Sequence, residues 1–79
     1  MVTATAYAMS EAEYQKEWCS KHNGAIDYKT QDKTTVDCLT DAYSVELDLA
    51  EKWVQAMRKS RDKSLSTGKA PGVVLILQN

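Results

Sequence analysis

The sequence predicts an α/β (α+β) fold whose elements follow the order helix, three strands, helix, strand. A capping box opens the first helix, three short segments with strand patterning follow, and a second helical segment separates them from a final apolar run. Short turns between the three central segments predict an antiparallel meander. The second helix then acts as a crossover that can place the last strand parallel to the third, which gives a mixed sheet.

Length and composition allow one domain, which we expect to span residues 10–79. The chain has 79 residues, a net charge of −1 and a hydrophobic content of 43%, so its core is only marginally sufficient for stability. The balanced charge excludes bulk electrostatic binding to nucleic acid or membrane, although local patches remain compatible with it. No apolar run is long enough to span a bilayer.

The first half of the chain contains clear local signals. Ser10 and Glu13 form a capping box, and the helix that follows is expected to reach about His22. Residues 26–30 alternate between apolar and polar side chains, as a strand does, and residues 31–33 make the turn. Strands are then expected at 34–39 and 44–49, joined by a two-residue loop at 41–42.

A second helix is expected to start at Asp48, which would be its N-cap with Glu51 at the third helical position. It should continue to about Leu65. Its predicted buried face consists of Ala50, Trp53, Val54 and Met57. The last run, 73–77, is apolar throughout and therefore predicts a strand covered on both faces. We expect the two tryptophans, Trp18 and Trp53, to be core anchors.

Two cysteines, Cys19 and Cys38, indicate either a disulfide in an exported domain or two buried thiols in a cytoplasmic one. The triplet at 6–8 (Ala-Tyr-Ala) has the small-x-small pattern of a signal-peptide cleavage site. We therefore expect residues 1–9 to include the remnant of a signal peptide, and a periplasmic or secreted location is favoured. A bridge would close a loop of roughly 20 residues and stabilise the fold by about 3 kcal/mol.

Two carboxylates in the hairpin predict either a site or an exposed polar face. With a two-residue loop, Asp37 lies directly opposite Glu46, and like charges in that position are destabilising. A divalent cation or a nearby lysine would compensate, and Lys52 follows one turn into the second helix. The alternative is that both acids face solvent, with Asp48 as a helix cap and Lys52 exposed.

Three stretches resemble a family of small PD-(D/E)xK nuclease-like proteins. They are Val36-Asp37-x-Leu39-Thr40, Glu46-x-Asp48-x-Ala50-x-Lys52-Trp53 and Thr67-Gly68-Lys69-x-Pro71-Gly72-Val73-Val74-Leu75-Ile76. The similarity covers about Glu13 to Leu77, and many members of the family are uncharacterised bacterial or phage proteins. It implies the restriction-endonuclease-like fold, whose common core has the element order expected here.

The resemblance implies a set of site residues. Asp37 and Glu46 would bind Mg²⁺ (or Mn²⁺) and support phosphodiester hydrolysis of nucleic acid. The lysine expected two residues after Glu46 is replaced by Asp48, so Lys52 would act from the helix instead. Glu13 on the first helix, together with Asp48, would be accessory.

The sequence also departs from the family. Similar proteins carry Gly-Gln in the middle of the second helix and a tyrosine four residues after the glutamine, where this chain has Arg58-Lys59 and Lys63. The resemblance therefore implies either an active enzyme or a degenerate fold that binds or inhibits a protein partner.

Partners are also suggested by the charge of the second helix and by the end of the sheet. The basic residues of the second helix would contact a nucleic-acid backbone or form a solvated helix end. They are Arg58, Lys59, Arg61 and Lys63. Similar proteins continue into a further helix, so we expect an exposed edge or apolar face through which the chain could form a homodimer.

Overall fold

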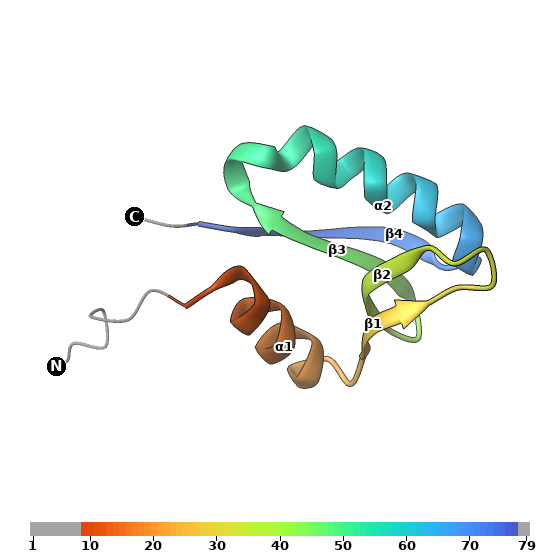
Figure 1. Ribbon diagram of the computed structural model, residues 1–79, viewed down its shortest axis with the longest axis horizontal. Coiled ribbons are helices and arrows are strands. Elements are labelled where there is room, and N and C mark those ends of the chain that lie inside the picture. The colour runs from red at the N-terminus through yellow and green to blue at the C-terminus, as the bar shows by residue number, and fades with distance from the viewer. Residues whose placement is uncertain (1–8, 78–79) are drawn as a thin grey trace, which may run out of the picture.

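The computed structural model describes residues 9–77, which form two α-helices and one four-stranded sheet (Figure 1). The elements are α1 (Glu11–Lys21), β1 (Ala25–Lys29), β2 (Thr35–Leu39), β3 (Tyr43–Leu49), the 3₁₀ turn η2 (Ala50–Lys52), α2 (Trp53–Thr67) and β4 (Ala70–Ile76). This order confirms the predicted one. The signal-peptide remnant expected in residues 1–9 lies almost entirely outside the described residues.

The sheet has the predicted mixed topology. Its strands lie in the order β1-β2-β3-β4, with the first three antiparallel and β4 parallel to β3. The hairpin register is also the predicted one, since Cys38 pairs with Val45 and Leu39 with Ser44. The second helix is therefore the crossover between two parallel neighbours.

The two helices cover opposite faces of the sheet (Figure 1). The apolar core lies on the α1 side and consists of Cys19, Cys38, Val45, Leu47 and Ile76, with Tyr14, Trp18, Leu49 and Val74 packed against it. Because alternate residues of a strand share a face, Asp37, Glu46 and Asp48 belong to the opposite face, under α2. The placement of Trp18 against the core agrees with its prediction as an anchor.

A disulfide joins Cys19 of α1 to Cys38 of β2, which is the bridged one of the two alternatives that the cysteines allowed, and both cysteines are buried. Gly24 packs directly against this bridge. A Cβ atom at Gly24 would lie 2.8 Å from Cys19 Sγ and closer still to Cys38 Sγ. The turn from α1 into β1 therefore needs the absence of a side chain at this residue.

One predicted helix start is confirmed and the other is wrong. The Ser10 Oγ atom accepts a hydrogen bond from the Glu13 N–H at 3.1 Å, and Glu13 Oε1 accepts one from the Ser10 N–H at 2.8 Å. Asp48, in contrast, lies inside β3, and α2 begins after Lys52 without a side-chain cap. The reason is that β3 continues to pair with β4 as far as Leu49, which holds Asp48 in the sheet.

The buried face of α2 is not the predicted one. Trp53, Val54 and Met57 remain 51%, 42% and 55% exposed, whereas Ala56 and Ser60 are buried. The Ser60 Oγ atom donates a hydrogen bond to the Gly72 carbonyl at 2.9 Å. Small side chains thus bring α2 close to the sheet, and Trp53 is not a core anchor.

The last strand is also less covered than predicted. β4 lies at an edge of the sheet, and Ile76 is its only buried residue. The apolar run predicted a strand covered on both faces, but the side chains of β4 other than Ile76 are exposed or half-buried. Within residues 9–77, β4 also has a neighbouring strand on one side only. No helix in this part of the chain is both long and apolar enough to cross a membrane.

Candidate functional site

The backbone pairing of β2 with β3 is replaced by side chains at Asp37. The Asp37 N–H donates to Glu46 Oε2 at 3.2 Å, and the Leu47 N–H donates to Asp37 Oδ2 at 3.0 Å. Each carboxylate therefore accepts from the backbone of the opposite strand. The structure places Asp37 and Glu46 side by side, as the hairpin register predicts.

The pairing of β2 with β1 is interrupted at the same level. Asp27 has a left-handed backbone with φ of 50°, and the pairs on either side are Ile26 with Cys38 and Tyr28 with Val36. A left-handed residue inside a strand is typical of a bulge or of a functional constraint.

Gln15 of α1 spans this interruption. Its Nε2 atom donates to Asp27 Oδ1 and to the Asp37 carbonyl, both at 2.9 Å. The Asp37 backbone is consequently held by Glu46 of β3 at its N–H and by Gln15 of α1 at its carbonyl. Gln15 and Asp27 are not predicted from the sequence, because neither belongs to a motif.

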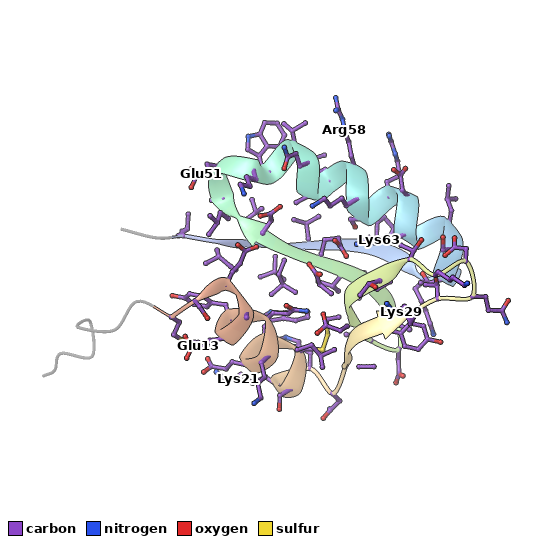
Figure 2. The ribbon with its side chains drawn as sticks, viewed as in Figure 1. Glu13, Lys21, Lys29, Glu51, Arg58 and Lys63 are labelled. Carbon is purple, nitrogen blue, oxygen red and sulfur yellow. A yellow bond between two sulfur atoms is a disulfide. The ribbon has the colours of Figure 1, made fainter. Side chains whose placement is uncertain are left out.

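The lysine that compensates the negative charge of Asp37 and Glu46 is Lys63 of α2. Its Nζ atom lies 2.8 Å from Glu46 Oε1, and the two side chains are only 18% and 4% exposed. Lys63 lies on the side of α2 that faces the sheet (Figure 2). The helical spacing of Ala56, Ser60 and Lys63 is the signal that could have identified it, since residues four and three apart share a helix face.

The pKa of Glu46 is raised above its ordinary value. Burial is the largest cause, and the nearby Asp37 carboxylate adds to it. Hydrogen bonds from Lys63 and from the Asp37 N–H act in the opposite direction without cancelling the effect. A buried carboxylate with a raised pKa and a specific charged partner is typical of functional sites.

The layer between α2 and the sheet is polar. Its buried residues include Ser44, Glu46, Asp48 and Ser60, and the Asp48 Oδ1 atom accepts from the Leu49 N–H at 2.9 Å. The Ser44 hydroxyl is fully buried and has no hydrogen-bond partner among the described residues. Buried hydroxyls without a partner are uncommon and costly, by about 1–3 kcal/mol. This layer is therefore unlike an ordinary core.

Of the other residues that the family resemblance implies, Asp48 lies in this polar layer, whereas Lys52 and Glu13 lie apart from it. Lys52 is exposed in η2, and among residues 9–77 it makes no ion pair. Glu13 takes part in the capping box of α1, where the backbone and hydroxyl of Ser10 lower the pKa of its carboxyl group. The structure thus unites Asp37 and Glu46 with Lys63 rather than with Lys52.

Asp32, in the turn between β1 and β2, has a strongly shifted pKa for a different reason. Hydrogen bonds from the hydroxyls of Thr30 and Ser66, and then from Thr34, hold the pKa of its carboxyl group well below the usual range. Ser66 belongs to α2, so this exposed carboxylate ties the turn to the end of that helix. We assign it a structural role.

A metal ion would have few protein ligands here. Within the described residues, no three or more His, Cys, Asp or Glu side chains are grouped so as to hold one. Asp37 and Glu46 are a pair of hard oxygen donors, which suits a cation that keeps several water ligands, as Mg²⁺ does.

Of the remaining basic residues, Arg58 and Arg61 line a surface groove of about 690 Å³ between α2 and β4. Its other lining residues are Trp53, Val54, Met57, Ser60, Pro71, Gly72 and Val73. Lys59 is exposed on the same helix. We call this feature the α2–β4 groove.

No protein-family model, curated protein or solved structure matches this chain. Membership of the PD-(D/E)xK family therefore stays a prediction that depends on the motif residues.

Proposed function

We propose that the chain hydrolyses phosphodiester bonds in nucleic acid with the help of Mg²⁺ or Mn²⁺, at a site formed by Asp37, Glu46 and Lys63. The observation that supports this most is the arrangement of two carboxylates on adjacent strands with a lysine ammonium 2.8 Å from one of them. Two acids and a lysine also form the constellation that the family resemblance implies, with Lys63 in place of Lys52.

Each residue has a chemical task in this proposal. Asp37 and Glu46 would supply the oxygen ligands of the cation, which when bound would activate a water and neutralise phosphate charge. Lys63 would hold its ammonium group close to the phosphate and stabilise the negative charge that develops there. Gln15 donates a hydrogen bond to the backbone carbonyl of Asp37 and would thereby position the Asp37 carboxylate.

Calorimetric titration with Mn²⁺, followed by cleavage assays on single- and double-stranded DNA and RNA, tests the proposal. We expect wild type to bind the ion and cleave at least one substrate, Asp37→Asn and Glu46→Gln to lose ion binding, and Lys63→Met to bind the ion without cleaving. Glu51→Gln is the matched control, because Glu51 is an exposed acid outside the cluster (Figure 2). Failure of the wild type to bind Mn²⁺ or Mg²⁺ would refute the proposal.

A binding module is the second candidate function, and the engagement of both acids favours it. Asp37 and Glu46 already accept hydrogen bonds from backbone N–H groups, and Glu46 is paired with Lys63. A degenerate site of this kind would stabilise the fold while another surface binds a protein. Ion binding without cleavage of any substrate would favour this function over hydrolysis.

We also propose that the protein is exported. The Cys19–Cys38 disulfide supports this, because disulfides form and persist mainly in oxidising compartments.

A further inference from the structure

The α2–β4 groove is lined mainly by apolar side chains that remain exposed. Trp53, Val54 and Met57 line it from the helix, and Pro71 and Val73 line it from the strand. All three helical residues are more than two-fifths exposed. Clustered apolar side chains of this size on a surface are typical of interaction sites.

The strand that borders the groove is also open to pairing. β4 has β3 on one side and no neighbour on the other within the described part of the chain. An exposed edge presents a row of backbone N–H and C=O groups on which another extended chain can form hydrogen bonds. The edge and the groove together offer both backbone and side-chain contacts to the same ligand.

The charge at the groove is positive. Arg58 and Arg61 contribute to its lining, and none of the acidic residues between 9 and 77 does. Neither arginine takes part in an ion pair among residues 9–77. Arg58 extends from α2 at the molecular surface (Figure 2), where a carboxylate of a ligand can reach it.

We infer that the α2–β4 groove binds an extended acidic segment of a protein partner, which adds to β4 as a fifth strand. Its apolar side chains would lie against Trp53 and Met57, and its carboxylates would pair with Arg58 and Arg61. Strand addition of this kind takes affinity from backbone hydrogen bonds and specificity from alternate side chains.

Two other occupants fit less well. In a second copy of the chain, β4 has the sequence APGVVLI and brings no carboxylate, so a symmetric pair of β4 strands would leave the arginines of both copies unmatched. Single-stranded nucleic acid would stack its bases on aromatic side chains, but of the aromatic residues that the structure describes only Trp53 lines the groove.

Titration with an octapeptide of alternating Glu and Val, followed by the amide resonances in NMR, tests the inference. We expect saturable shifts at 72–76 and at the Trp53 indole, and no saturable binding of the corresponding Lys-Val peptide. The double variant Arg58→Glu with Arg61→Glu should bind the acidic peptide roughly tenfold or more weakly. Lys16→Glu with Lys29→Glu is the matched control, with the same change of charge at exposed residues outside the groove, and should bind as wild type does.

Several results would overturn the inference. They are shifts that map away from α2 and β4, equal binding of the acidic and basic peptides, and wild-type affinity in the Arg58 and Arg61 double variant. Tighter binding of a twelve-nucleotide oligothymidine at the same resonances would reassign the groove to nucleic acid. Concentration-dependent dimerisation with loss of peptide binding would reassign it to a second copy of the chain.

Discussion

Glu46 is a titratable residue that is 3% exposed in the middle of β3. One of its oxygens is paired with Lys63 and the other accepts from the Asp37 N–H, so both of its charge-stabilising partners are fixed by the fold. Removing the Glu46 carboxylate from water costs more than these two partners return, which is why the pKa of Glu46 is raised despite these bonds.

This raised pKa predicts a specific dependence of stability on pH. The folded protein holds the Glu46 proton more tightly than the unfolded chain, whose pKa is near 4.5, so this stabilisation is complete below pH 4.5 and is lost as pH rises through the folded pKa. Relative to Glu46→Gln, we expect the free energy of unfolding of wild type to fall as pH is raised above 4.5. Chemical denaturation at a series of pH values measures it. Parallel curves for the two proteins would contradict the prediction.

The rotation of α2 about its own axis determines which of its residues form the site. Ala56 and Ser60 face the sheet, and Lys63 follows them on the same side, whereas Met57 faces outward. The sheet face that α2 meets is polar, so it favours small and polar helix residues at the contact. The larger apolar residues are left at the surface, where they form the α2–β4 groove.

A pair of substitutions in α2 tests this rotation. Ala56→Glu would bury an unpaired carboxylate in a space that fits only a methyl group, so we expect a loss of about 3 kcal/mol or more in the free energy of unfolding. Met57→Glu places the same side chain at the neighbouring, exposed residue and should cost less than about 1 kcal/mol. Thermal or denaturant unfolding measures both. A greater loss in Met57→Glu than in Ala56→Glu would mean that the opposite helix face is buried.

At the scale of the whole molecule, the disulfide is a covalent cross-link between α1 and strand β2 of the sheet. Cys19 and Cys38 belong to the small apolar core on the α1 side, together with Val45, Leu47 and Ile76. Domains of this size bury a comparatively small fraction of their surface, so a single covalent link contributes a large share of the stability.

Replacing Cys19 and Cys38 together by alanine should lower the free energy of unfolding by about 3 kcal/mol, because the unfolded chain regains the entropy of an open loop. For a domain of this length, that corresponds to a decrease in Tm of roughly 12–24 °C. Calorimetric melting of wild type with and without a thiol reductant provides the matched measurement. An unchanged midpoint after complete reduction would show that the bridge does not contribute to stability.

Features that depend on neighbours along the chain are the ones that could be predicted from the sequence. The capping box of Ser10 and Glu13, the element order and the hairpin register follow from local hydrogen bonding, turn chemistry and alternation. The register in turn predicts that Asp37 and Glu46 lie together, which the structure shows. The cysteine count gave the pairing, because two cysteines have one possible partner each within the chain, and the structure shows that the bridge is formed.

The contact partners of those residues, in contrast, depend on how the helices pack against the sheet. Lys63 rather than Lys52 reaches Glu46, Gln15 reaches Asp37, and Asp48 stays in the sheet instead of capping α2. The physical reason is that a helix buries the side that fits the surface it meets, and a strand ends where its neighbour ends. Both conditions depend on segments distant in the sequence, which local patterns of apolar and polar residues do not encode.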